Sequence, residues 1–147
     1  MLRVVLDTNV FASSLLVKEG LPAQVLDAWR ARRFLLIISP ALASEIAATL
    51  RYPHIRSRYR VTEEDVQALL DLLERDAILA PGEADVGGAV PEDHDDEIIL
   101  ACAIDGGADL IVSGDGHLLA LGEYQGIEIL TVRKFLERLD QESASSV

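Results

Sequence analysis

Val4-Val5-Leu6-Asp7 is a short apolar run that ends at an acid, and Leu110-Ile111-Val112 is a second such run, which leads through Ser113-Gly114 to Asp115. Short, branched apolar runs are typical of buried strands. Ligands gather at the carboxyl ends of the strands in an open parallel α/β sheet, so Asp7 and Asp115 are expected to meet at one edge. Two carboxylates placed together repel each other unless they share a proton or bind a cation. The sequence therefore predicts a charged site at that edge.

Strand-like and helix-like segments alternate along the rest of the chain. Further strands are expected near residues 34–38, 77–79 and 128–130, and helices are expected between them. This alternation predicts an α/β fold, in which a parallel five-stranded sheet has right-handed crossovers and helices on both faces.

Helix starts and the extent of the domain are also expected from the chain. Ser39-Pro40 is typical of an N-cap with proline at the first helical position, and Thr62 with Asp65 is a weak capping box. At 147 residues the chain is expected to form one domain, over residues 1–140. Residues 141–147 are expected to be a frayed, disordered tail.

The composition is that of a chain that can fold without disulfides. Hydrophobic residues make up 50% of it, and Cys102 is the single cysteine. No signal peptide and no apolar run long enough to span a bilayer are recognisable, so a cytoplasmic protein without membrane association is expected. The net charge of −12, from 13 Lys+Arg against 25 Asp+Glu, argues against nonspecific nucleic-acid binding over the whole surface.

Further acids lie between the two strand-terminal aspartates. Glu45 is in a predicted helix, and Glu92-Asp93-His94-Asp95-Asp96-Glu97 opens an apolar helix. Each acid has a structural explanation, because Asp7 suits a turn, Asp115 an N-cap, the acidic run a helix N-terminus and Glu45 a solvated surface. Five acids in six positions nevertheless exceed what a helix start requires. With no Cys/His ligand set, an all-oxygen site favours Mg²⁺ or Mn²⁺, and a metal-dependent hydrolase is expected.

One basic segment stands out in this acidic chain. Residues 51–60 carry four arginines, two tyrosines and a histidine, but no acid. Phosphate contacts combined with stacking rings suit a single-stranded polynucleotide, whereas a solvated helix face is the structural alternative. The candidate substrate-binding residues are Arg51, Arg56, Arg58 and Arg60, with Arg30, Arg32 and Arg33 as further cations.

The order of these motifs resembles the PIN-domain family of nucleases. The motifs are Val4-Val5-Leu6-Asp7-Thr8-Asn9-Val10, Ser39-Pro40 with Glu45, Asp95-Asp96 with Ile99, and Asp109-Leu110-Ile111-Val112-Ser113-Gly114-Asp115. The resemblance covers the chain from Leu2 to about Leu139, and it is greatest to small prokaryotic, VapC-like toxins of toxin–antitoxin pairs. It implies a single PIN-like domain of three layers.

The resemblance also implies roles for individual residues. An acidic catalytic quartet would consist of Asp7, Glu45, Asp96 and Asp115. Three of these, Asp7, Asp96 and Asp115, would bind Mg²⁺ or Mn²⁺, and Glu45 would order or deprotonate the attacking water. Asp96 is preferred to Asp95 because it stands three residues before Ile99, as the third acid of the family does. The supporting residues would be Thr8, Asn9, Asp95 and Ser113.

The implied activity is that of a metal-dependent endoribonuclease, which hydrolyses phosphodiester bonds of single-stranded or looped RNA. The implied partners are RNA, a cognate antitoxin and a second copy of the chain. Two alternatives stay open: a catalytically silent PIN fold that acts as a binding module, and a metal-dependent phosphatase. A phosphatase of the haloacid-dehalogenase type would need a second acid two residues after Asp7, where Asn9 stands.

Overall fold

The structure is a computed structural model that describes residues 1–17, 19–86 and 94–145. In chain order the elements are β1 (Arg3–Leu6), α1 (Thr8–Leu16), α2 (Leu21–Arg30), β2 (Leu35–Ile38), α3 (Pro40–Leu50), α4 (Pro53–Tyr59), α5 (Glu63–Asp76), β3 (Ile78–Leu79), α6 (His94–Asp105), β4 (Leu110–Val112), α7 (Gly116–Leu121), β5 (Glu123–Tyr124), β6 (Ile127–Leu130) and α8 (Val132–Ser145). The predicted alternation of strands and helices is confirmed.

The two apolar runs that flank the site are neighbouring central strands. The strand order is β3-β2-β1-β4-β6-β5, and β1 pairs in parallel with β4, with Leu6 opposite Val112. The chain moves from β1 through β2 to β3 on one side and then crosses to β4 on the other side of β1. A topological switch point therefore lies between β1 and β4, where open α/β sheets bind ligands. The backbone amide of Asp7 donates to the carbonyl of Val112 at 2.9 Å, which holds the two strand ends together.

The sheet differs from the predicted one in the number of strands. The described residues form six strands rather than five, and β5 pairs antiparallel with β6. Gln125 and Gly126 connect them with φ angles of 50° and 85°, as a tight two-residue hairpin requires. A two-residue strand before an atypical Gln-Gly turn gives little sequence signal, and the prediction of an all-parallel sheet was wrong in this respect.

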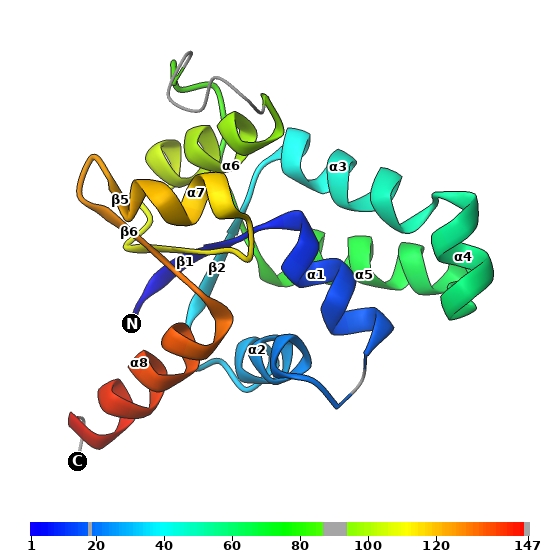
Figure 1. Cartoon of the computed structure of the whole chain (residues 1–147), viewed down its shortest axis with the longest axis horizontal. Coiled ribbons are helices and arrows are strands. Elements are labelled where there is room, and N and C mark those ends of the chain that lie inside the picture. Colours follow the sequence, from blue (N-terminus) through cyan, green and yellow to red (C-terminus); the bar gives the residue numbers. More distant parts are fainter. Residues whose placement is uncertain (18, 87–93, 146–147) are drawn as a thin grey trace.

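Helices cover both faces of the sheet, as predicted. Figure 1 shows α6 and α7 on one face, and α2 and α8 on the other. The core lies between these layers, and the side chains of Phe11, Leu42, Leu100 and Phe135 are fully or almost fully buried in it. No helix in the described part of the chain is long and apolar enough to cross a membrane.

Two predicted helix starts are confirmed, and one predicted end is wrong. The Ser39 hydroxyl accepts a hydrogen bond from the Leu42 amide at 3.2 Å, and Thr62 and Asp65 form a reciprocal capping box. Helix α8 continues to Ser145, so residues 141–145 are helical instead of forming a frayed tail. This segment contains no Gly or Pro that would end the helix.

Burial should make the single cysteine unreactive. Cys102 is fully buried in α6, and desolvation raises the pKa of its thiol to about 11. Roughly one thiol in a thousand is then ionised at pH 8, and the thiolate is the reactive species. We expect a disulfide reagent such as Ellman's reagent to modify native protein very slowly and urea-unfolded protein within seconds to minutes. Rapid, complete modification of the native protein would contradict this burial.

Candidate active site

Ser113 connects the two strand-terminal aspartates. Asp7 is 6% exposed, and one of its carboxylate oxygens, Oδ2, accepts a hydrogen bond from the Ser113 hydroxyl at 2.6 Å. The Ser113 hydroxyl oxygen in turn accepts a hydrogen bond from the backbone amide of Asp115 at 2.9 Å. The predicted supporting residue Ser113 therefore lies between Asp7 and Asp115, at the carboxyl ends of β1 and β4.

The environment of Asp7 disfavours its negative charge. Burial is the largest cause that raises the pKa of its carboxyl group, and the charge of Asp115 raises this pKa further. Hydrogen bonds from the Ser113 side chain and from the backbone of Asn9 and Thr8 offset part of the shift. Burial nevertheless outweighs these hydrogen bonds, so the pKa stays raised. A buried carboxylate of this kind would be stabilised by a nearby cation.

Asp115 serves both as a helix cap and as part of the acidic site. One of its oxygens, Oδ1, accepts hydrogen bonds from the amides of His117 at 2.8 Å and Leu118 at 3.2 Å. The structural explanation of Asp115 as an N-cap is thus correct. Because Oδ1 accepts both helix amides, Oδ2 is the oxygen with more capacity left to bind a cation.

Asp96 approaches Asp115 from the other side of the site. Asp96 lies in the first turn of α6 and is 4% exposed. Three possible ligand atoms, one each from Asp96, Asp115 and His117, lie within 4.8 Å of one another. Such a group could hold a metal ion. The structure describes the side chain of Asp96 but not those of His94 and Asp95, and residues 92 and 93 lie outside the described residues. The choice of Asp96 over Asp95 therefore stays a prediction.

His117 is a potential ligand that the motifs in the sequence do not single out. The expected donor set was all-oxygen, but the imidazole of His117 lies beside two of the predicted acids. The signal in the sequence is the spacing Asp115-Gly116-His117, which places a histidine in the first turn of the helix that Asp115 caps.

The remaining predicted residues lie around this group. Glu45 is half-buried in the second turn of α3, which packs on α1, and its Oε2 is shielded from solvent. Thr8 is 4% exposed, and its hydroxyl has no hydrogen-bond partner among the described residues. Asn9 contributes through its backbone, whereas its side chain is exposed. Glu45 and Asp7 fall outside the three-residue group within the described part of the chain.

This arrangement fits a hard divalent cation. Two nearly buried carboxylates, Asp7 and Asp96, lie at one edge of the sheet with the partly exposed Asp115. Repulsion among them would be relieved by a cation, and oxygen-rich sites favour Mg²⁺ or Mn²⁺. Such an ion could polarise a phosphate ester and activate water.

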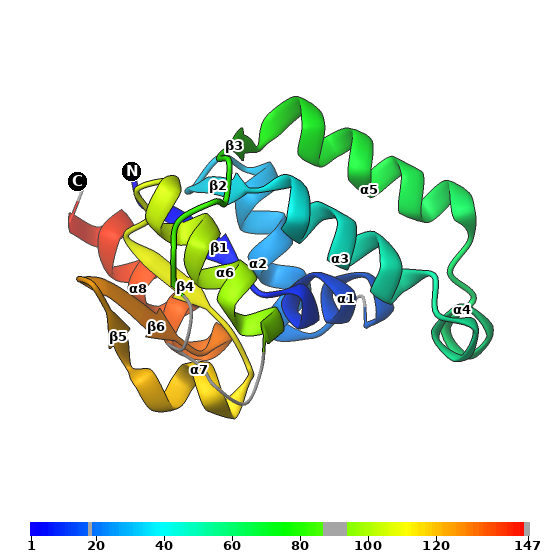
Figure 2. The same ribbon diagram turned by 90° about the horizontal axis from the view of Figure 1, so that it is seen from above.

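The arginines proposed to bind substrate lie away from the acids. Figure 2 shows α4 at the far end of α3, remote from the strands. Arg51 forms two hydrogen bonds with Glu63, at 3.1 and 2.6 Å, and Arg56 lies 3.9 Å from the same carboxylate. Arg58 lies over the ring of Tyr59, at 5.4 Å from its centre. Their role in substrate binding stays a prediction.

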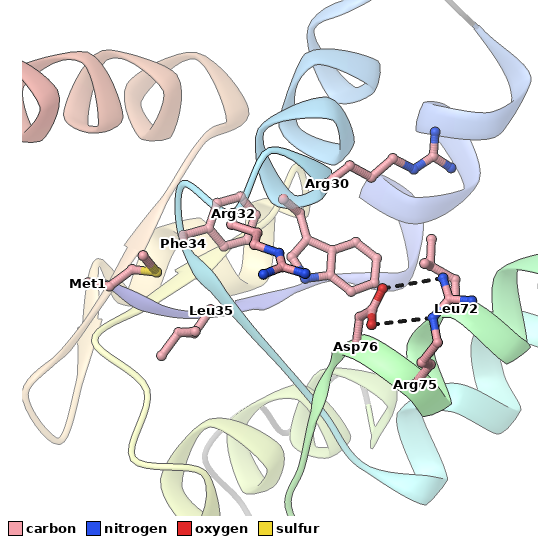
Figure 3. Close-up of a pocket in the computed structure, with 9 residues that line it drawn as sticks. Met1, Arg30, Arg32, Phe34, Leu35, Leu72, Arg75 and Asp76 are labelled. Atoms are coloured by element: carbon pink, nitrogen blue, oxygen red, sulfur yellow. Dashed lines mark hydrogen bonds and ion pairs between the residues drawn. The ribbon is translucent and has the colours of Figure 1, made fainter.

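The three further arginines lie at the opposite edge of the fold. Arg30 and Arg32 line a hollow of about 360 Å³ with Met1 and Leu35, which mark the amino ends of β1 and β2 (Figure 3). Arg33 forms an ion pair with Asp140 at 3.2 Å. Because Asp7 lies at the carboxyl end of β1, this hollow is separate from the acidic site.

Comparison with known proteins agrees with this geometry. A family model described as PIN domain matches residues 3–117. The uncharacterized protein MJ1680 of Methanocaldococcus jannaschii is 24% identical over 148 residues, which cover 95% of this chain and 93% of that protein. In fold, the chain is similar to the crystal structure of VapBC2 from Rickettsia felis bound to a DNA fragment from their promoter, with a TM-score of 0.58 and 15% identity over 88% of this chain and 98% of that one. The family match covers most of the chain, including Asp7, Glu45, Asp96 and Asp115, and the chain therefore belongs to the PIN domain family.

Proposed function

We propose that this PIN domain is a metal-dependent endoribonuclease that cleaves single-stranded or looped RNA. The observation that carries the proposal is the convergence of Asp7, Asp96 and Asp115 at the switch point of the sheet. A carboxylate site at this position in a PIN domain is suited to phosphodiester hydrolysis with Mg²⁺ or Mn²⁺.

The four acids would share two tasks in this mechanism. Asp7, Asp96 and Asp115 would bind the ion, which supplies charge stabilisation for the phosphate and a more acidic bound water. Ser113 donates a 2.6 Å hydrogen bond to one oxygen of Asp7, which would orient the carboxylate and leave its other oxygen available to hold the ion. Glu45 would orient the attacking water or accept its proton.

The proposed recognition of RNA rests on the basic segment. Tyr52 and His54 are stacked, with ring centres 5.9 Å apart, and Tyr52 is exposed. Such rings, in the same segment as Arg56, Arg58 and Arg60, would provide stacking surfaces beside phosphate contacts. The acidic remainder of the surface would confine the polynucleotide to such a path.

A toxin role with an antitoxin partner belongs to the same proposal. The structural relative from Rickettsia felis is a VapBC complex, which supports the idea of a cognate antitoxin. A homodimer is proposed on the family resemblance. Expression of the wild-type chain in bacteria should then arrest growth, and inactivation of the acidic site should relieve the arrest.

The test is cleavage of a mixed RNA pool by the wild-type chain and by the Asp96→Asn variant. We expect cleavage with Mn²⁺ or Mg²⁺, none with a chelator, and a loss of about 10²-fold or more in the variant, because an ion contributes several kcal/mol to such a step. Asp27→Asn is a matched control, since Asp27 is exposed on α2. If folded wild-type protein cleaves no RNA with either ion, a silent binding module becomes the better account.

A further inference from the structure

We propose that His117 is a ligand of the cation in this site and that its imidazole makes the site prefer Mn²⁺ to Mg²⁺. The inference rests on the proposed function, because it assigns a further ligand and a metal preference to the same site. It adds a nitrogen to the three acids, which supply only oxygen atoms.

The distances suit a shared ion. The ligand atoms of Asp96, Asp115 and His117 lie within 4.8 Å of one another. Two ligands of one ion, each about 2.1 Å from it, can be at most roughly 4.2 Å apart. Small side-chain rotations that move the ligand atoms by a few tenths of an ångström would therefore let all three bind one cation.

The three donors come from two elements that the fold fixes. Asp96 is held by α6, and Asp115 and His117 lie at the start of α7. The Asp115 carboxylate accepts the amide hydrogen bonds of His117 and Leu118, which fixes the backbone of His117 beside that carboxylate. The position of His117 is thus set by the same cap that positions Asp115.

The imidazole of His117 is free to turn toward an ion. Its Nδ1 is 3.8 Å from Oδ1 of Asp115, which is too long for a hydrogen bond, and its side chain is 52% exposed. From Asp96 through Asp115 to His117 the group changes from buried to exposed. His117 would therefore bind the ion from the solvent side, while Asp96 binds it from within the fold.

An imidazole changes which ion the site prefers. Mg²⁺ is a hard ion that favours oxygen ligands and retains its waters, whereas Mn²⁺ and the later transition metals accept nitrogen more readily. Replacing the imidazole should therefore weaken Mn²⁺ binding more than Mg²⁺ binding. A role limited to packing or to the helix cap would alter both affinities equally or neither.

The experiment measures ion binding without relying on cleavage. Electron paramagnetic resonance of free Mn²⁺ gives its affinity, and competition gives that of Mg²⁺. We expect His117→Asn to weaken Mn²⁺ binding at least about tenfold and Mg²⁺ binding less than about threefold. His54→Asn, on α4, is the matched control and should change neither.

Electron spin echo modulation of bound Mn²⁺ identifies the nitrogen directly. Wild-type and His54→Asn proteins should show a histidine ¹⁴N coupling, and His117→Asn should lose it. Mn²⁺ binding with no ¹⁴N coupling, or a coupling that persists in His117→Asn and disappears in His94→Asn, would overturn the assignment while leaving the proposed metal site intact. If wild-type protein binds no Mn²⁺, the proposed metal site fails together with the inference.

Discussion

Replacing Asp7 by asparagine is expected to reduce metal-dependent RNA cleavage strongly and, in the absence of metal, to make the protein more stable. Asparagine can keep the hydrogen bond from Ser113, but it provides no negative charge for an ion. We expect activity to fall by about 10²–10³-fold, because several kcal/mol of charge stabilisation are lost. The melting temperature should rise by roughly 3 °C, which corresponds to about 1 kcal/mol.

The increase in stability should depend on pH. Burial raises the pKa of Asp7 in the folded state above its usual value of 3.8. At a pH between 3.8 and the raised pKa of the folded state, Asp7 holds a proton in the folded chain that it has released in the unfolded chain. The free energy of unfolding therefore falls as the pH rises through the folded-state pKa. The ionised carboxylate is therefore most costly at neutral pH, and the benefit of asparagine should be larger at pH 7 than at pH 4.

Thermal unfolding in the presence of a chelator, at both pH values, tests this prediction. Asp27→Asn serves again as the control and should change the melting temperature by less than about 1 °C. An Asp7→Asn variant that is less stable than the wild type at pH 7 would show that the buried charge is already compensated by the protein. An active variant would remove Asp7 from the site altogether.

Replacing Gly106 by alanine is expected to destabilise the fold by about 2–3 kcal/mol. A Cβ atom at this position would lie 2.4 Å from Cγ2 of Ile37 and 3.1 Å from the carbonyl oxygen of Cys102. Ile37 is fully buried in β2, so it has little room to move. The same close approach seats α6 against the sheet, and α6 carries Asp96. We therefore expect weaker Mn²⁺ binding as well.

Urea unfolding measures the change in the free energy of unfolding, and two controls test whether it arises from the contact with Ile37. Gly116→Ala adds a Cβ that meets no atom within 4 Å, and it should change stability little. In an Ile37→Ala background, Gly106→Ala should cost much less than in the wild type, because the clashing methyl group has been removed. Equal costs in both backgrounds would contradict the proposed contact.

The parts of the fold that follow local rules could be predicted from the sequence. Ser39 and Thr62 cap their helices as expected, because capping depends on residues three positions apart. The approach of Asp7 to Asp115 follows from the general property that ligand-binding residues gather at strand ends. By contrast, β5 is too short to leave a periodic pattern, and only its pairing with β6 defines it.

The features that depend on tertiary contacts could not be predicted. Arg51 and Arg56 read as free cations in the sequence, but the start of α5 brings Glu63 to them. The proximity of His117 to Asp96 arises only when α6 and α7 pack at the same edge. The raised pKa of Asp7 likewise depends on burial by elements distant in the sequence.

The most direct test of the account is an anomalous difference map from crystals soaked in Mn²⁺. We predict a peak at the carboxyl ends of β1 and β4, roughly 2.1 Å from carboxylate oxygens of Asp7, Asp96 and Asp115 or bridged to them by water. A map with no peak among these carboxylates at saturating Mn²⁺, or with its peak elsewhere on the protein, would contradict the central claim that they form a metal site.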